Sequence, residues 1–418
     1  MNIEFKEGKS FAENLDIKDP LKHFRDKFLI PKQQNGNDVI YFAGNSLGLQ
    51  PKSVRNYVEQ ELKDWETFAV EGHTHAKNPW MPYHEILTEQ TAEITGAVPE
   101  EILNMNSLTV NLHLLFVSFY RPDKNRHKIL IESNSFPSDH YAVQSQIKFH
   151  GFDPKSSLIE IKPREGEDKI RTEDIEELIE KEGDSTALIW IAGVNYYTGQ
   201  AFDMKKITEA GHRKGCIVGF DLAHATGNLI LNLHDWNVDF AVWCNYKYMN
   251  GGPGTIGGAF VHERHLKNAS LPKFLGWWGH DKKTRFLMDH TYIPIPTAES
   301  WQISNPPILQ LASLKASLDI FKEAGMKVLR EKSKSLTAYL EFLIKSNNFG
   351  NIEIITPSEL NERGCQLSLR IKSNGKGLYN RLIKEGVICD WREPDVIRIA
   401  PVPLYNTYSD VYDFIKFL

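Results

Sequence analysis

Residues 216–224 read Cys216-Ile217-Val218-Gly219-Phe220-Asp221-Leu222-Ala223-His224, an apolar run that ends in an acid and a histidine. Similar short apolar runs occur at 102–105, 128–131, 187–191, 238–244 and 258–261, and helical patterns occur at 84–94, 109–120 and 204–214. Short apolar strands separated by helices predict a mainly parallel sheet with helices on both faces. Ligands bind such α/β sheets beyond the carboxyl ends of the strands, so the residues there are the first candidates for chemistry.

The composition excludes several classes of protein. The 418 residues include 49 Lys+Arg and 54 Asp+Glu, giving a net charge of -5, so a partner such as nucleic acid or an anionic membrane is not expected and a small substrate is. Four cysteines lie far apart without a Cys-x-x-Cys motif, which indicates a reduced, cytoplasmic protein without a zinc or disulfide framework. No apolar run approaches the ~20 residues of a membrane span, and the first residues lack the apolar core of a signal peptide.

The pattern changes after Gly325, where a helix at 329–346 is followed by strands at 351–356, 365–371 and 396–400. Before this point Asn305-Pro306-Pro307 is expected to begin a strong helix, with Asn305 as its cap. We therefore predict a large domain over residues 61–310 and a small domain made of residues 1–60 with 311–418.

A lysine follows the apolar run 238–244. Lys247 lies in Trp243-Cys244-Asn245-Tyr246-Lys247-Tyr248, before the glycine-rich residues 250–254. A sheltered lysine of lowered pKa can form a Schiff base, although a surface lysine in a turn is the simpler interpretation. The glycine-rich loop lacks Gly-Lys-Ser/Thr, so a nucleoside triphosphate is not the expected ligand.

Two further features belong with this lysine. Asp221 follows its strand directly, where it is either a ligand-binding acid or the cap of the next segment. Ser107-Leu108-Thr109 stands between a strand and a helix, either as an ordinary N-cap or as an anion site made of unpaired backbone N–H groups. A pyridoxal phosphate (PLP) enzyme needs all three features: a lysine for the aldehyde, a carboxylate for the pyridine nitrogen and a helix N-terminus for the phosphate.

Longer motifs make the sequence resemble the kynureninase family, in the aminotransferase class V group of fold-type-I PLP enzymes. The motifs cover most of the chain and are residues 41–49, 106–113, 136–139, 197–200, 219–225, 246–248, 276–280, 303–307 and 398–405. The resemblance implies an α/β fold like that of aspartate aminotransferase, with a mainly parallel seven-stranded sheet in the large domain and a small α+β domain.

The resemblance also implies roles for individual residues. Lys247 would carry PLP as a Schiff base, Asp221 would pair with the pyridine nitrogen, and Tyr246 would bind the phosphate and help to move protons; these three are the expected catalytic residues. The remaining cofactor contacts implied are Leu108 and Thr109 at the phosphate, Phe136 stacked on the ring, Asp139 near the pyridine edge, His224 at the ring substituents, and Trp277 and Asn305. Phe136 as a core aromatic and Trp277 as a packing residue are the structural alternatives.

Substrate contacts follow from the same resemblance. Arg398 would clamp the substrate α-carboxylate, because its planar fork suits bidentate binding. His73, Ser304 and Asn305 would recognise the aromatic ring, and Trp277 would come from the partner subunit of a homodimer with shared active sites. His73-Thr74-His75 looks like a metal pair but has no recognisable third ligand, so no metal is expected.

The reaction implied is the hydrolysis of L-kynurenine, and of 3-hydroxy-L-kynurenine, to anthranilate or 3-hydroxyanthranilate and L-alanine. Its place would be tryptophan catabolism or NAD biosynthesis. Another class V enzyme is the alternative, either a cysteine desulfurase, which needs a mobile cysteine, or an aminotransferase, which needs an α-keto acid. A catalytically dead scaffold would be expected to lose Lys247 or Asp221. Ala192 departs from a serine found in some members, and Asn45 and His280 lie in the motifs without an assigned role.

Overall fold

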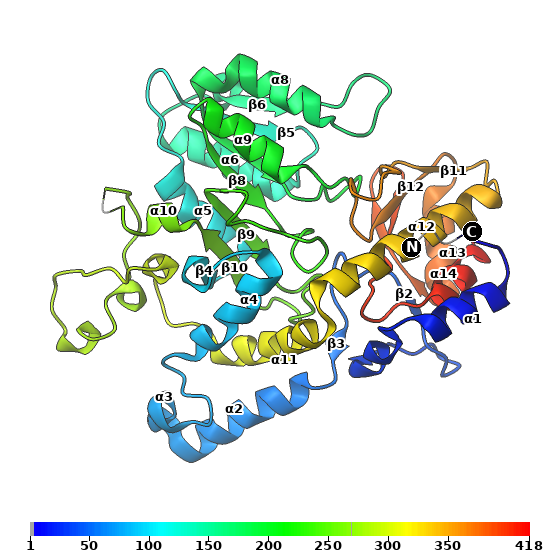
Figure 1. The fold of residues 1–418 in the computed structure, drawn as a ribbon, viewed down its shortest axis with the longest axis horizontal. Coiled ribbons are helices and arrows are strands. Elements are labelled where there is room, and N and C mark those ends of the chain that lie inside the picture. Colours follow the sequence, from blue (N-terminus) through cyan, green and yellow to red (C-terminus); the bar gives the residue numbers. More distant parts are fainter. Residues whose placement is uncertain (1–3, 269) are drawn as a thin grey trace.

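The computed structural model describes residues 4–268 and 270–418 and contains a seven-stranded sheet (Figure 1). The strands follow the spatial order β4-β10-β9-β8-β7-β5-β6. Their bounds are β4 Ile102–Asn104, β5 Lys128–Glu132, β6 Leu158–Ile161, β7 Thr186–Ala192, β8 Ile217–Asp221, β9 Phe240–Cys244 and β10 Gly257–Val261. Neighbouring pairs from β6 to β9 are parallel, and only β10 runs antiparallel to β9 and β4. The predicted mainly parallel sheet is confirmed.

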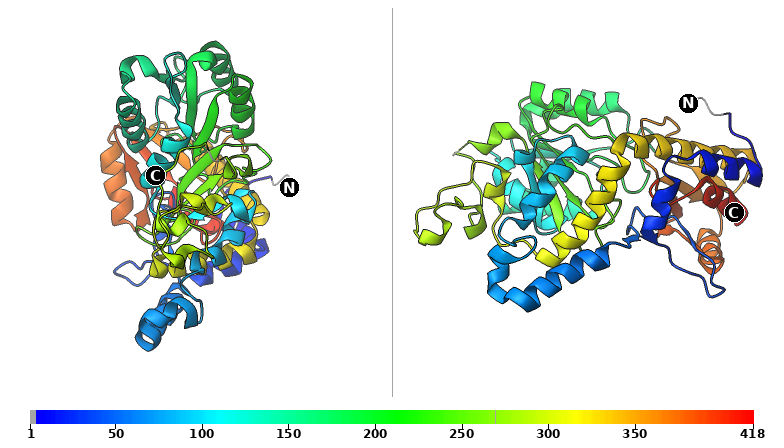
Figure 2. Two further views of the ribbon diagram at one scale, coloured as in Figure 1. Left: turned by 90° about the vertical axis from the view of Figure 1, so that its left-hand side faces the viewer. Right: turned by 60° about the horizontal axis from the view of Figure 1, so that its bottom comes forward.

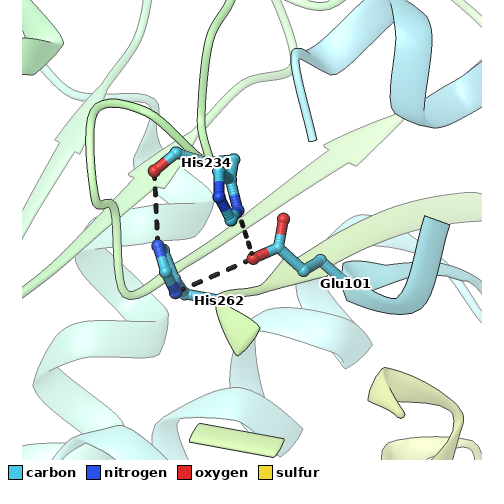
Figure 3. Close-up of side chains that lie close together, drawn as sticks. All are labelled: Glu101, His234 and His262. Carbon is cyan, nitrogen blue, oxygen red and sulfur yellow. Dashed lines mark hydrogen bonds and ion pairs between the residues drawn. The ribbon is translucent and has the colours of Figure 1, made fainter. Parts of the chain in front are cut away.

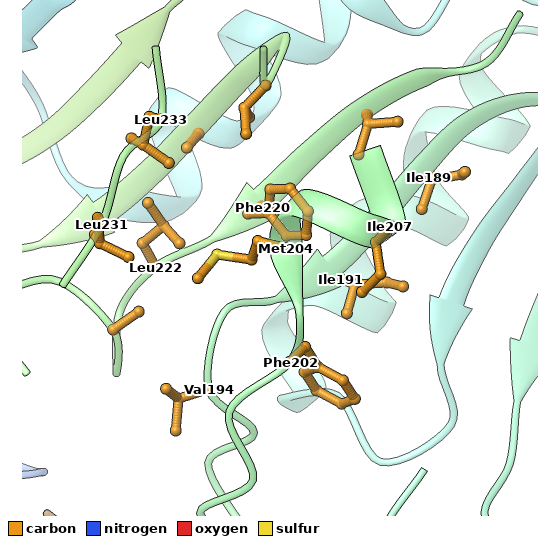
Figure 4. Packing of buried hydrophobic residues seen from close by; sticks show 14 of the residues in the cluster. Ile189, Ile191, Val194, Phe202, Met204, Ile207, Phe220, Leu222, Leu231 and Leu233 are labelled. Atoms are coloured by element: carbon orange, nitrogen blue, oxygen red, sulfur yellow. The ribbon is translucent and has the colours of Figure 1, made fainter. Parts of the chain in front are cut away.

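Alternating side chains of these strands feed two cores, one on each face of the sheet. Ile189, Ile191 and Phe220 belong to the core beneath α8 (Thr172–Glu182) and α9 (Met204–Arg213), which Figure 4 shows. Leu188 and Trp190, which alternate with Ile189 and Ile191 along β7, belong to the core on the opposite face, beneath α5 (Leu108–Phe119) and α6 (Pro137–Phe149). Both faces are therefore buried, as a parallel sheet requires.

A second, antiparallel sheet follows in the chain, with the spatial order β11-β12-β15-β14. Its strands are β11 Ile352–Ile354, β12 Leu367–Ile371, β14 Asp390–Arg392 and β15 Val396–Ile399. Around it lie α12 (Met326–Ser346), α13 (Gly375–Lys384), α14 (Tyr408–Ile415) and, from the other end of the chain, α1 (Lys9–Lys18), which packs against α14 (Figure 1). The N-terminal β2 (Ile40–Tyr41) pairs in parallel with β13 (Val387–Ile388).

Two helices run beside each other below the large sheet. These are α2 (Val54–Phe68) and α11 (Ile308–Ala324), and α11 turns at Gly325, with φ 73°, into α12 (Figure 2). The exact division of the chain into two domains stays a prediction. The remaining short elements are β1 Phe28–Leu29, β3 Gln50–Pro51, α3 Gly72–His75, α4 Thr88–Thr95, α7 Pro154–Ser157 and α10 Glu263–Leu266. Within the residues described, no helix combines the length and apolarity of a membrane span.

Two helix starts differ from the sequence prediction. Helix α11 begins at Ile308 with Pro307 as its N-cap, so the prediction that Asn305 caps it was wrong. A residue before proline is disfavoured in the helical region, so neither Asn305 nor Pro306 can begin the helix, and Pro307 is itself extended, with φ −76° and ψ 103°. The predicted helix 84–94 is a 3₁₀ turn over Tyr83–Leu87 followed by α4.

Candidate active site

A pocket opens at the carboxyl ends of the central strands. Its lining residues are Leu108, Thr109, Phe136, Ser138, Asp139, Ala192, Val194, Tyr196, Asp221, Ala223, His224, Tyr246 and Lys247. Asp221 ends β8, Ala192 ends β7, and Tyr246-Lys247 follow β9. Eight of the residues predicted for the cofactor therefore meet in one place, and Ser138 and Tyr196 join them without having been predicted.

Lys247 is held at the pocket by His224. The Lys247 Nζ lies 2.9 Å from His224 Nε2. Burial, together with the positive charges of Lys247, Arg398 and Arg392, lowers the pKa of His224 well below its usual value. The imidazole is thus neutral and accepts from Lys247 Nζ through Nε2, which leaves its proton on Nδ1. That Nδ1 atom is buried and has no protein partner.

Three buried carboxyl groups surround the base of the pocket. Asp221 Oδ1 accepts the Ala223 N–H at 2.7 Å, so the residue does cap the following turn while it also lines the pocket. Burial raises the pKa of Asp221, and burial together with the charge of Asp221 raises that of Asp139 further. Glu132, at the end of β5, is fully buried, and burial raises its pKa to about 8. The cluster of three carboxyl groups can therefore hold protons at neutral pH.

Glu132 was missed by the sequence prediction although the signal was present. It directly follows the apolar residues Ile129–Ile131, just as Asp221 follows its own strand. Both of its oxygens lie 3.3 Å from the Ala192 N–H. Ala192 thus lies between two acids, because β7 lies between β5 and β8.

The opposite end of the pocket is suited to an anion. Helices α5 and α6 both begin there, and the Thr109 and Ser138 hydroxyls lie 3.0 Å apart. The Ser107 side chain makes no capping hydrogen bond, so it does not compete for the first N–H groups of α5. Unpaired N–H groups and the dipoles of two helices favour a negative group at this point.

The remaining wall is formed by Phe136 and Tyr196. Phe136 is 45% exposed, which excludes a core role, and its ring meets Tyr196 edge-on at 5.2 Å. Behind Tyr196 lies Arg398, which is almost fully buried and donates to the Tyr196 carbonyl at 2.8 Å and to Ser46 Oγ at 3.1 Å. Arg398 also pairs with Asp390.

The N-terminal motif 41–49 packs against the residues of this pocket. The Gly48 N–H donates to the Tyr246 carbonyl at 2.8 Å, and a Cβ on Gly48 would lie 2.4 Å from the Lys247 carbonyl oxygen. Asn45 Nδ2 donates to Gln366 Oε1 at 2.9 Å, and Gln366 in turn donates to the Tyr196 carbonyl. Asn45 therefore joins the small sheet to the pocket.

Five predicted residues do not line this pocket: Arg398, which lies behind Tyr196, and His73, Trp277, Ser304 and Asn305. Trp277 is 42% exposed, and Ser304 and Asn305 are exposed. The segment that carries Trp277 lies beside the segment that carries Ser304 and Asn305, because the Trp278 N–H donates to the Ile303 carbonyl at 3.3 Å. His280, also without a predicted role, accepts the Ile293 N–H at 3.1 Å and bonds Thr284 at 3.0 Å, which closes the loop beyond Trp277.

A separate cluster of Glu101, His234 and His262 has the composition of a metal site (Figure 3). Its lone pairs are already engaged: Glu101 Oε1 lies 3.0 Å from His234 Nδ1 and accepts the Glu263 N–H at 2.8 Å. His262 Nδ1 accepts the Arg264 N–H at 3.2 Å. These bonds tie α10 to the turns before β4 and β9, a structural function.

Comparisons with known proteins give relatives that match nearly the whole chain. A family model described as "Kynureninase C-terminal domain" matches residues 329–418. The chain is 59% identical to a kynureninase of Koribacter versatilis over 412 residues, covering 99% of this chain and 97% of that one. It is 52% identical to a kynureninase of Rattus norvegicus over 426 residues, covering 97% of this chain and 92% of the relative.

Solved structures show the same fold at low identity. A cystine C-S lyase variant with glycine linked to its PLP cofactor aligns with a TM-score of 0.78 at 16% identity, over 94% of this chain and 98% of the other. A cysteine desulfurase from Thermococcus onnurineus aligns with a TM-score of 0.75 at 17% identity, over 90% and 93%. The near full-length relatives are decisive: this chain belongs to the kynureninase family.

Proposed function

We propose that this protein holds PLP on Lys247 and hydrolyses L-kynurenine, and 3-hydroxy-L-kynurenine, to L-alanine and the corresponding anthranilate. The observation that carries the proposal is the meeting of Lys247, Asp221 and the N-terminus of α5 at one pocket in a chain of this family. Each group then matches one part of the cofactor: aldehyde, pyridine nitrogen and phosphate.

Two orphaned polar atoms support the fit. Asp139 Oδ1 and His224 Nδ1 are buried without protein partners, and both residues line the pocket. An acid next to Asp221 suits a protonated pyridine nitrogen, and an imidazole N–H suits an oxygen substituent on the ring. When bound, PLP would supply an electron sink for the negative charge that develops at the substrate α-carbon.

The chain itself would bind the substrate and move the protons. Lys247 Nζ would be the base that takes the α-proton. Burial raises the pKa of Tyr246, so its hydroxyl stays protonated and can donate during hydration of the γ-carbonyl and during protonation of the β-carbon after the Cβ–Cγ bond breaks. Such acid–base help is worth ~10²–10⁴-fold. Arg398 would hold the α-carboxylate.

We also propose a homodimer in which each subunit completes the other's site. Trp277, Ser304 and Asn305 are exposed and lie outside the pocket of their own chain. The nearby Phe286 is 63% exposed and Leu287 73% exposed. A second copy would cover these apolar side chains and would receive the predicted contacts.

A cysteine desulfurase is the less favoured alternative. Such an enzyme needs an accessible cysteine to accept sulfur, and all four cysteines of this chain lie in the described part and are buried. Burial raises the pKa of Cys365 and of Cys389 to about 12, which suppresses the reactive thiolate. An aminotransferase is distinguished by its second substrate, because hydrolysis of kynurenine requires no α-keto acid.

The test is made with purified protein and PLP. We expect a visible absorbance band and release of anthranilate from kynurenine without added pyruvate, and both should be lost in Lys247→Ala. The matched control is Lys273→Ala, because burial lowers the pKa of Lys273 to about 8 yet this lysine lies over Trp301 outside the pocket. Turnover that persists in Lys247→Ala, or turnover that depends on pyruvate, would refute the proposal.

A further inference from the structure

Three charged residues share one face of the small sheet. Asp390 on β14 and Arg398 on β15 are directly opposite each other in the antiparallel register. Arg392, two residues after Asp390 on the same strand, therefore presents its side chain to the same face. The hairpin thus places two guanidinium groups around one carboxylate.

The contacts fix this arrangement. Arg398 Nη2 pairs with Asp390 Oδ2, and Arg392 Nη1 forms an ion pair with Asp390 Oδ1 at 2.9 Å. Arg392 Nη1 also donates a hydrogen bond to the Trp391 carbonyl at 3.1 Å. The Asp390 side chain is 11% exposed and that of Arg398 only 1%. The Arg392 side chain is 36% exposed. One carboxylate compensates one guanidinium, so the cluster retains a single positive charge in a partly buried place. A buried charge without a partner is costly, and an incoming anion would offset that cost.

Unpaired hydrogen-bond donors in the cluster also indicate a site for an anion. The Nε atoms of both Arg392 and Arg398 are buried and make no hydrogen bond in the structure. Arg398 lies against Tyr196, with its guanidinium carbon 6.0 Å from the ring centroid, and Tyr196 lines the active-site pocket. The charges of both arginines reach the pocket, since both depress the pKa of His224.

We infer that Arg392 is a second substrate-binding guanidinium, which acts with Arg398 on the α-carboxylate while Asp390 holds the two arginines in place. This inference rests on the proposed function, which supplies an amino-acid substrate. Two guanidiniums and two carboxylates would then balance in charge. A ligand without the α-carboxylate leaves the excess charge unpaired, so the pair would make the site specific for amino acids over amines.

The experiment compares two ligands by calorimetry on the holoenzyme. L-Alanine carries the α-carboxylate, and the amine formed by removing that carboxylate from kynurenine does not. We expect Arg392→Gln to weaken L-alanine binding about tenfold, the effect of losing one charged hydrogen bond, and to leave binding of the amine unchanged. Arg392→Lys, which keeps the charge, should restore part of the affinity.

Arg370→Gln is the matched control. Arg370 lies on the same sheet, but its guanidinium is bonded to Asp168 at 3.0 Å and not to Asp390. Its substitution should leave the affinity for both ligands unchanged. Equal L-alanine affinity in Arg392→Gln and wild type, or an equal loss for both ligands, overturns the role of Arg392.

The same preparation separates the two proposals. If wild-type protein hydrolyses kynurenine while Arg392→Gln binds L-alanine normally, only the assignment of Arg392 fails. If wild-type protein does not hydrolyse kynurenine, the proposed function fails regardless of the binding data. Kinetics provide a second readout, since Arg392→Gln should raise KM for kynurenine more than it lowers kcat.

Discussion

The stability of the Glu132→Gln variant should increasingly exceed that of the wild-type protein as the pH rises. Glu132 is wholly buried, and among the described residues it forms no ion pair; both oxygens lie 3.3 Å from the Ala192 N–H. The negative charge of Asp221 lies close enough to oppose its ionisation. Glutamine has nearly the shape of the protonated acid but cannot ionise.

The magnitude follows from the pKa. Burial, and to a lesser degree Asp221, raises the pKa of Glu132 from 4.5 to about 8. In the unfolded chain the group loses its proton near pH 4.5, whereas the folded protein keeps it until about pH 8. Between these values the folded state binds more protons, so the free energy of unfolding falls as the pH rises. At about 1.4 kcal/mol for each unit of pKa, the total loss is about 4–5 kcal/mol.

The assay is urea unfolding of the cofactor-free protein between pH 5 and pH 9. The difference in unfolding free energy between Glu132→Gln and wild type should grow in favour of the variant by about 4 kcal/mol from pH 5 to pH 8, and then level off. Glu177→Gln, an exposed position on α8, is the control and should follow wild type at every pH. A difference that does not change with pH would refute this account of Glu132.

Three other outcomes follow from buried charges and thiols. Lys332→Ala should cost about 3–5 kcal/mol in urea unfolding, because it strips Asp19, 3% exposed, of a partner at 2.7 Å. Asp239→Asn should make the stability of the protein less sensitive to acid. Hydrogen bonds from His212 and His265 lower the pKa of Asp239, so the wild-type protein loses the stability that the ionised carboxylate contributes as the pH falls below about 4. Thermal unfolding between pH 3 and 6 measures this, and an equal loss of stability in the variant and in wild type would refute the reasoning. The four buried cysteines should react with a thiol reagent only as fast as the protein unfolds, and rapid labelling of the native protein would contradict their burial.

The fold was predictable because its signals are local. The predicted strands of the large sheet are mostly apolar and mostly buried on both faces, as in β7 and β9, and such runs are visible one at a time. The start of α11 was not predicted, because the capping preference of Asn305 and the restriction imposed by two consecutive prolines oppose each other. The structure shows that the prolines prevail.

The residues of the candidate site also differ in whether a local sequence signal marks them. Asp221 and Lys247 are recognisable because each follows a strand, and Glu132 could have been found in that way. Arg392 and Asp390 carry no such signal. Their relation to Arg398 depends on the register of an antiparallel pair, which the sequence between residues 390 and 398 does not specify.

The distribution of charge argues for one orientation of an amino-acid substrate. Acids lie at the base of the pocket beside Asp221, and the arginines lie behind Tyr196 on the small sheet. An α-carboxylate therefore belongs on the Tyr196 side and the amine at Lys247, since the reverse placement would set carboxylate against carboxylate. With both polar ends fixed, the substrate side chain must extend toward the open mouth bordered by the exposed Phe136. This chain brings none of its predicted ring-recognition residues, His73, Ser304 and Asn305, to line that pocket, and this supports our proposal of a homodimer in which a second subunit supplies contacts to the ring.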